Sequence, residues 1–300
     1  MRDHDHGGLG VRASNRLSLS VALGIVATVS LVGASFWSVP AAGEKSVNLR
    51  TDRIRVSYVP PKNPAHQAAY ELLKERRVLE RFKEFLSPLR LPRELELRTE
   101  GCDGEVNAWY EDDAITICYE YLADIVKNAP QETTPEGITR MDAIVGPALE
   151  TVLHELGHAL FDYHAVPVLG REEDAADQFA AYIMLQFESK RAVRRLMAGV
   201  AYAYNREASL PSLKKNPFAD EHGLPAQRFY NALCMAYGAD PKLFADVVAS
   251  ERLPKERAEG CEYEYEQVGR AMKKLIVPYI DQALAKKVRA KRTLQFDDRR

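Results

Sequence analysis

The sequence lacks an excess of basic residues, an internal repeat and any closely spaced pair of cysteines. Lys plus Arg number 41 against 43 Asp plus Glu, which gives a net charge of −2, and this balance argues against a nucleic-acid partner. Gly and Pro, at 17 and 16 of 300 residues, are too few for a collagen-like or low-complexity chain. With 46% hydrophobic residues, the chain has the composition of a globular protein that buries a core in one or two domains.

Only the first 42 residues depart from this average. Residues 1–16 carry three arginines, residues 17–37 carry no charge, and Val39 and Ala41 then stand at the −3 and −1 positions of a signal-peptidase site. This order predicts a cleaved secretory signal. The uncharged run is also close to the ~20 residues that a membrane anchor needs, so a retained anchor that associates the protein with a membrane is the alternative. Either segment predicts export, to a periplasm or to the extracellular space.

The four cysteines are consistent with export. Their number is even, all lie beyond the N-terminal segment, and no C-x-x-C pair suggests a zinc or redox motif. We expect the disulfides Cys102–Cys118 and Cys234–Cys261, because each closes a short local loop and would stabilise the fold by ~3 kcal/mol on chain-entropy grounds. The alternative is four buried free thiols.

Hydrophobic periodicity predicts a small sheet followed by an array of helices, which is an α+β fold. We expect one domain over residues 43–285, with an α/β lobe to about residue 170 and a helical lobe after it, and then a charged tail at 286–300. The expected strands are 53–58, 94–98, 105–110 and 114–118. The expected helices are 67–86, 141–163, 172–188, 191–204, 226–237, 241–249 and 256–284.

One short motif carries chemistry. His154-Glu155-Leu156-Gly157-His158 lies within the long predicted helix, where the two histidines are one turn apart on the same face and can meet one metal ion. Glu155 lies beside that pair, within reach of a water next to the metal. In this H-E-x-x-H arrangement Zn²⁺ and a carboxylate together activate water for hydrolysis. Two histidines on a polar helix face with no ligand are the alternative.

A catalytic zinc needs a third protein ligand. His164 has the spacing of the metzincin motif H-E-x-x-H-x-x-G-x-x-H, but Phe161 replaces the glycine that ends the helix there. If the helix continues, His164 is turned about 240° from His158 and points away from the metal.

Residues 172–177 (E-E-D-A-A-D) instead resemble the second motif of the gluzincins, in which H-E-x-x-H is followed by E-x-x-x-D on the next helix. This resemblance implies that Glu173 is the third ligand and that Asp177 accepts the free ring N–H of His154. Two alternatives stay open at this point. Glu172 or Asp174 could be the ligand, or the acidic segment could simply complement the dipole of a helix N-terminus.

The same resemblance suggests roles for two further segments. Asn107-Ala108-Trp109-Tyr110 is similar to the edge-strand segment of thermolysin-like enzymes, which pairs with an extended peptide substrate; a plain hairpin strand is the alternative. Gluzincins often use a downstream histidine to stabilise the oxyanion, and His222 is the best-placed candidate. A surface-loop histidine, with Tyr230 or Arg228 as the donor, is the other interpretation.

Over residues 50–280 the chain resembles a family of bacterial proteins described as metallopeptidases from their motif. The shared features are N-A-x-Y, I-x-I-C-Y-E, H-E-L-G-H-A-L, P-V-L-G-R-E-E-D-A-A-D-Q and Q-R-F-Y-N-x-x-C. The resemblance implies a zincin-like fold and a zinc peptidase acting on a peptide or protein substrate, with Glu155 as general base. The rival hypothesis is a zinc-stabilised binding or assembly module of the cell envelope that cleaves nothing.

Overall fold

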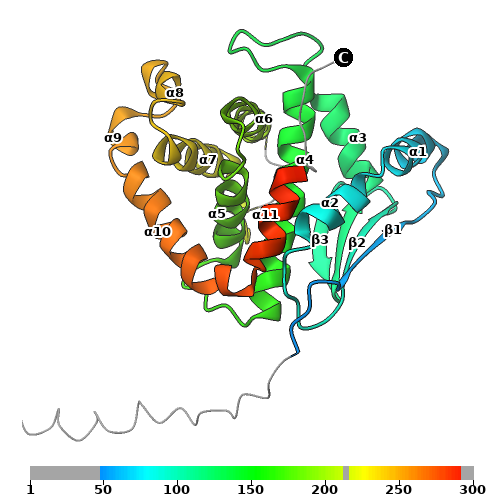
Figure 1. The fold of residues 1–300 in the computed structure, drawn as a ribbon. Coiled ribbons are helices and arrows are strands. Elements are labelled where there is room, and N and C mark those ends of the chain that lie inside the picture. Colours follow the sequence, from blue (N-terminus) through cyan, green and yellow to red (C-terminus); the bar gives the residue numbers. More distant parts are fainter. Residues whose placement is uncertain (1–47, 212–215, 292–300) are drawn as a thin grey trace, which may run out of the picture. The chain divides into compact units, whose positions relative to one another are not determined.

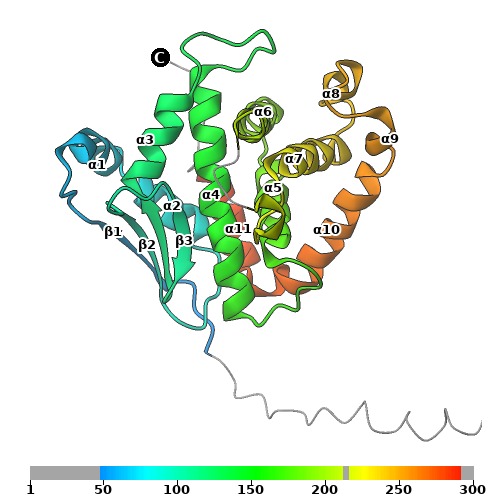
Figure 2. The same cartoon turned by 180° about the vertical axis from the view of Figure 1, so that it is seen from behind.

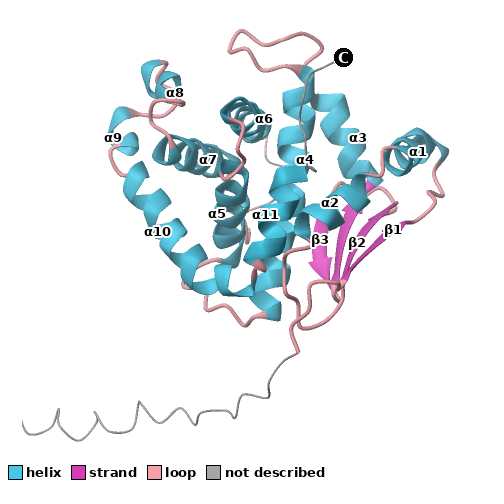
Figure 3. Cartoon of the chain, in the orientation of Figure 1, coloured by secondary structure: helices cyan, strands magenta, loops and turns pink. Residues whose placement is uncertain are grey.

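The computed structural model describes residues 48–211 and 216–291 (Figure 1). A small mixed sheet comes first in the chain and helices make up most of the remainder, as Figure 3 shows, so the predicted α+β class is confirmed. The signal or anchor predicted for residues 1–42 lies outside the described residues. Within the described part, no helix is long and apolar enough to cross a membrane.

The sheet has four strands in the order β1-β2-β4-β3. β1 (Ile54–Tyr58), β2 (Leu95–Glu100) and β4 (Ala114–Cys118) run parallel, while β3 (Ala108–Glu111) is antiparallel to β4 and forms one edge. Buried and half-buried residues alternate along β2, as a strand with one face toward the core requires. All five residues of β4 are buried, because this central strand is covered on both faces.

In the first lobe, one predicted helix is divided in the structure. The single helix expected over 67–86 is two helices, α1 (Gln67–Glu75) and α2 (Val78–Leu86). Arg77 adopts a left-handed conformation with φ of 52° and breaks the helix between them. Helical periodicity continues across such a one-residue break, so the pattern alone does not reveal it. α2 packs on β1 and β2, and α3 (Tyr119–Asn128) follows β4 directly.

The longest helix, α4 (Arg140–Tyr163), begins at a capping box in which the side chains and backbone amides of Thr139 and Asp142 bond reciprocally. It packs against β3 and β4 on one side and against the helical lobe on the other. A short loop reverses the chain into α5 (Glu172–Leu185), which packs along α4. Gly157 allows this close packing, since a Cβ there would lie 3.3 Å from the Cα of Ala176.

In the rest of the helical lobe, several helices begin or end at residues other than those predicted. The helix expected over 256–284 is broken at Gly260 and again at a 3₁₀ turn containing Pro278, which cannot continue a helix. Only Ala245–Ala249 of the helix expected at 241–249 is helical, and residues 286–291, assigned to a charged tail, continue the last helix. The remaining helices are α6 (Lys190–Ala208), α7 (Pro225–Ala239), α8 (Ala245–Ala249), α9 (Lys255–Ala258), α10 (Cys261–Leu275) and α11 (Gln282–Lys291).

Both predicted disulfides are confirmed. Cys102–Cys118 ties the loop before the hairpin to the end of β4, and Cys234–Cys261 joins α7 to the start of α10. The sulfurs of the second pair lie in the main core, where Cys234 and Cys261 are almost fully buried. The described residues contain no free cysteine.

The α4–α6 crossing yields a stability prediction. A Cβ at Gly199 would lie 2.0 Å from the carbonyl oxygen of Asp142, a contact that only backbone movement can relieve. We therefore expect Gly199→Ala to lower the free energy of unfolding by about 1–3 kcal/mol, the usual cost of overpacking. The matched control is Gly269→Ala on α10, where the new Cβ would lie 3.4 Å from the Tyr182 ring. Denaturant unfolding should show the control unchanged or stabilised, and equal midpoints for both variants would contradict the prediction.

Candidate metal centre

Five of the predicted site residues come from the α4–α5 pair, namely Glu155 and two pairs of residues that face one another. His154 and His158 lie one turn apart on α4, and Glu173 and Asp177 lie one turn apart on the first half of α5. Because the two helices pack against each other, these four side chains face one another. The side chains of His154, His158 and Glu173 are 5%, 14% and 18% exposed, so the cluster is buried at one end and reaches solvent at the other.

The donor atoms of His154, His158 and Glu173 converge. The two Nε2 atoms are 3.1 Å apart, and Oε2 of Glu173 lies 3.0 Å from Nε2 of His154 and 3.4 Å from Nε2 of His158. A tetrahedral zinc with bonds of ~2.0–2.1 Å separates its ligand atoms by roughly 3.3 Å. The spacing of these three atoms therefore fits one small cation with a remaining open position.

The other ring nitrogens of both histidines are occupied by carboxylates. Nδ1 of His154 lies 2.8 Å from Asp177, and Nδ1 of His158 lies 2.8 Å from Glu172. If each Nδ1 donates its proton there, both Nε2 atoms present lone pairs to each other and to the Glu173 carboxylate. Three acceptors that meet within 3.4 Å need a shared positive charge, which a divalent cation supplies.

The electrostatics of the cluster lead to the same conclusion. Burial disfavours a charged His154, but hydrogen bonds to Asp177 and Glu173 outweigh it and raise its pKa to about 10. Burial alone would raise the pKa of Asp177, yet its bonds with His154 and Arg228 lower that pKa to about 2. Hydrogen bonds from the three surrounding histidines hold the pKa of Glu173 well below its usual range in spite of burial. A field that so favours an added proton also favours a metal ion.

Glu155 lies next to the cluster and is 7% exposed. Burial raises the pKa of its carboxyl, while positive charge on the two histidines and a hydrogen bond from the backbone N–H of Tyr110 oppose the rise. The contact with Tyr110 places the carboxylate against β3, the edge strand. A buried carboxylate beside the candidate metal site and an edge strand is positioned to accept or release a proton there.

His222, the predicted downstream histidine, also reaches this cluster. Its Nε2 lies 2.8 Å from Oε2 of Glu173, and its ring stacks on that of His154 with centroids 5.6 Å apart. The side chain is 40% exposed, so it covers the solvent side of the donor atoms. The loop before α7 thus brings His222 next to His154, which lies 68 positions earlier in the sequence.

The model of a family described as "Putative metallopeptidase" matches residues 58–276. The chain belongs to this family. No curated protein and no solved structure matches it. Family membership indicates hydrolysis of a peptide or protein with the help of a metal ion, and the matched range includes every residue of the cluster described above.

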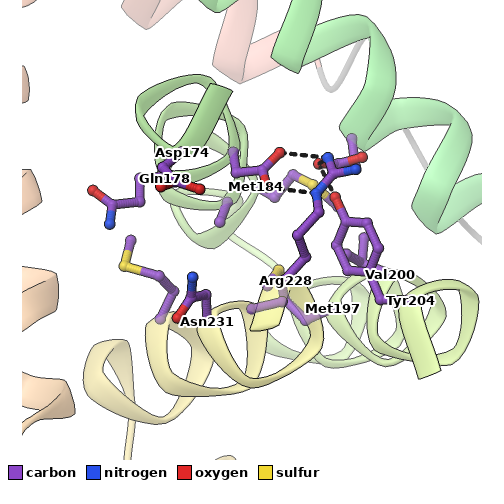
Figure 4. A pocket seen from close by; sticks show the side chains of 13 residues that line it. Asp174, Gln178, Met184, Met197, Val200, Tyr204, Arg228 and Asn231 are labelled. Atoms are coloured by element: carbon purple, nitrogen blue, oxygen red, sulfur yellow. Dashed lines mark hydrogen bonds and ion pairs between the residues drawn. The ribbon is translucent and has the colours of Figure 1, made fainter. Parts of the chain in front are cut away.

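Sequence reasoning missed a buried network behind the candidate metal site of this metallopeptidase. Arg228 on α7 donates two hydrogen bonds to Asp177, of 2.6 and 2.7 Å, and Tyr204 donates one of 2.7 Å to Glu150. Figure 4 shows Arg228 reaching past Tyr204, and its guanidinium lies 4.4 Å from the centre of that ring. The network locks Asp177 in place and so fixes the tautomer of His154.

One residue of this network could have been found from the sequence. Glu150 precedes His154 by four residues, as His154 precedes His158, so all three share one face of α4. Burial and the charge of Asp177 raise the pKa of Glu150. Arg228 and Tyr204 carry no such signal, because they come from separate helices with no fixed spacing to the motif. Because Arg228 donates two hydrogen bonds to Asp177, its guanidinium is not placed to stabilise an oxyanion.

The segment compared with a substrate-binding strand lies at the expected edge. Ala108 begins β3, pairs with Ile117 and leaves its other side unpaired by any described strand. Asn107 precedes the strand and is exposed, and its side-chain oxygen accepts a hydrogen bond of 3.0 Å from the N–H of Ala108. Because Glu155 accepts a hydrogen bond from the backbone N–H of Tyr110 on the same strand, an extended chain paired with β3 would lie close to the metal cluster.

His164 lies away from the metal cluster. The helix continues through Phe161 to Tyr163, and the His164 ring stacks on Tyr279 with centroids 3.6 Å apart. Its Nε2 is buried and has no hydrogen-bond partner among the described residues. The metzincin alternative, with His164 as the third ligand, therefore has no geometric support. Phe161 replaces the glycine that would end the helix, so the helix continues and His164 points away from the cluster.

This environment makes His164 a source of acid sensitivity. Burial lowers the pKa of His164 to about 4, against ~6.5 for an unfolded histidine. Between these values the unfolded chain binds a proton that the folded chain does not, so stability falls as the pH is lowered from 6.5 toward 4. We expect His164→Phe, which keeps the ring stacking, to reduce the loss of unfolding free energy between pH 7 and pH 5 by about 1–2 kcal/mol.

Urea unfolding of both proteins in the presence of a chelator measures this difference without contribution from metal release. A loss between pH 7 and pH 5 that is the same in wild type and variant would show that His164 does not titrate in this range on unfolding.

Proposed function

We propose that this metallopeptidase is a zinc-dependent hydrolase of peptide bonds, of gluzincin type and zincin-like fold. Its ligands are His154, His158 and Glu173. The observation that supports this most strongly is the convergence of these three acceptor atoms within 3.4 Å, each held by a second polar partner. Export to a periplasm or the extracellular space is part of the proposal. The two disulfides are compatible with it, because such bonds persist in oxidising compartments.

When bound, Zn²⁺ supplies a Lewis acid that polarises the scissile carbonyl and makes a neighbouring water acidic. The protein then moves the protons. Glu155 accepts a proton from the attacking water on its carboxylate and delivers it to the nitrogen of the leaving amine. Asp177 keeps the proton of His154 on Nδ1, and Arg228 keeps Asp177 ionised and oriented.

The substrate is proposed to bind as an additional strand along β3. Asn107 and Ala108 lie at the start of this edge, where an extended peptide would take the place of the Asn107 side chain, which now accepts the hydrogen bond from the N–H of Ala108. His222 is proposed to donate its Nε2–H to the oxyanion that forms during attack. Its position over the cluster and its hydrogen bond to Glu173 support this role, since a small rotation of an exposed side chain moves that donor from the carboxylate to a substrate oxygen.

A closed structural zinc site usually has four protein ligands. Here only three side chains supply metal-binding atoms, and these atoms lie toward solvent, beneath the 40% exposed side chain of His222. The buried carboxylate of Glu155 lies beside them and is not one of the ligands. These features favour the hydrolase over the non-catalytic envelope module.

Incubation of the purified protein with a peptide library or a denatured protein tests the proposal. Cleavage that a chelator abolishes and that Zn²⁺ restores is the expected result. A protein that binds zinc stoichiometrically but cleaves no member of the library under any condition would support the non-catalytic module instead.

A further inference from the structure

A cavity lies on the side of α4 away from the metal cluster. It has a volume of about 750 Å³, and its floor includes Leu153 and Leu156 of α4 and Phe179 of α5. At 100° per residue, Leu156 is turned roughly 160° away from both His154 and His158 on their helix. Phe179 is turned by a similar angle from Asp177. The α4–α5 layer therefore presents metal ligands on one face and the apolar cavity floor on the other.

Helix α11 covers part of this cavity. It lies in front of α4 and α5 in Figure 1 and behind them in the reverse view of Figure 2. Ala285 and Val288 of α11 line the cavity, together with Phe85 and Leu89 of the α2 region and Ile276 after α10. Ion pairs hold both ends of α11: Lys291 pairs with Glu84 at 3.0 Å, and Asp281, just before the helix, pairs with Arg90 at 3.2 Å.

Most of the lining side chains are apolar, and helices carry the cavity floor and the wall formed by α11. The backbone N–H and C=O groups inside those helices are already bonded within each helix, so the floor and this wall offer few partners to a peptide backbone. A hydrocarbon chain needs none. The volume lies within the ~300–1,000 Å³ of small-molecule pockets, and burial of each methylene contributes about 0.8 kcal/mol.

The charged residues among those lining the cavity have one predominant sign. Arg191 and Arg195 come from the start of α6 and Arg289 from α11, against the single acid Glu188. Arg195 also pairs with Asp142 at 2.6 Å, whereas Arg289 is exposed and forms no hydrogen bond or ion pair with the residues that the structure describes. The lining thus combines a large apolar space with a net positive charge.

We propose that this cavity binds a single-chain amphiphile, with its acyl chain among the apolar walls and its anionic head group at Arg289. The site is separate from the metal centre, so the proposal does not depend on peptidase activity. It assigns the face of α4 opposite the metal ligands to ligand binding.

Hexadecanoate is the probe, and its binding to the full protein is measured by calorimetry or by displacement of a fluorescent fatty acid. Ala285→Trp places a ring in the cavity and should weaken binding at least tenfold. The matched control, Ala283→Trp, adds the same ring to the exposed face of α11 and should bind as wild type does. Shortening the chain from 16 to 12 carbons should weaken binding by about two- to fourfold per methylene removed.

Arg289→Gln tests the head group without altering the apolar walls. It should weaken hexadecanoate binding about three- to tenfold, while Lys287→Gln on the far side of α11 should leave it unchanged. Hexadecanol should bind wild type more weakly than hexadecanoate and should not respond to Arg289→Gln.

Three binding results would overturn the proposal, as would one result on oligomeric state. They are no saturable binding of hexadecanoate, equal binding by Ala285→Trp and Ala283→Trp proteins of wild-type thermal stability, and binding only after deletion of residues 292–300. The last would make the chain's own C-terminal segment the occupant. A dimer that Ala285→Trp dissociates would equally replace the amphiphile by a second copy.

Discussion

Glu155→Gln is expected to abolish peptide hydrolysis while the protein keeps its metal. The substitution is isosteric and removes only the ability of the side chain to accept and release a proton, so kcat should fall by about 10³-fold, within the 10²–10⁴ range of lost general acid–base groups. KM should change little, because Glu155 contacts the edge strand and the metal cluster without forming the backbone edge proposed to bind the substrate.

Metal content and thermal stability measured beside kcat make this result specific. Zinc stoichiometry equal to that of wild type shows that the loss of activity does not come from an emptied or unfolded site. Neutral Gln also removes the cost of burying a carboxylate at this 7% exposed position, so we expect stability to be equal or slightly higher. A variant that hydrolyses peptides at the wild-type rate would end the assignment of Glu155 as general base.

The parts of the site that could be predicted are those fixed by helix geometry. His154 and His158 share a face because they are four residues apart, and the same holds for Glu173 and Asp177. The meeting of the two pairs needed one further condition, a short reversal between α4 and α5, in which Pro167 lies and Gly170 adopts a positive φ of 115°. The third-ligand alternatives were separated by Phe161, since a residue without glycine's freedom lets the helix continue past the motif.

The parts that could not be predicted depend on tertiary contacts. Arg228 reaches Asp177 across 51 positions and Tyr204 reaches Glu150 across 54, and no local period encodes such pairs. The break at Arg77 and the division of residues 256–284 into three helices were missed for a related reason. Helical periodicity records which side chains face the core, and it survives a turn that changes the direction of the axis.

Glu173→Ala is expected to have the largest effect on the metal. It removes one of three donors and leaves two imidazoles facing each other, so the affinity for Zn²⁺ should fall more than the 10–100-fold typical of an outer residue that orients a ligand. Asp177→Asn, which leaves all three donors in place but disturbs the tautomer of His154, should fall within that 10–100-fold range. Peptidase activity should disappear in the first variant and return in part at high zinc concentration in the second.

Asp174→Ala is the matched control, because Asp174 lies in the same first turn of α5 and pairs with Arg171 at 2.8 Å on the exposed side. It should keep one metal ion per chain, as should His164→Ala, whose ring lies on Tyr279 and away from the cluster. Metal analysis after dialysis against a weak chelator separates the four variants. If His164→Ala loses the ion while Glu173→Ala retains it, the ligand set belongs to the metzincin pattern, and the role proposed for Glu173 is wrong.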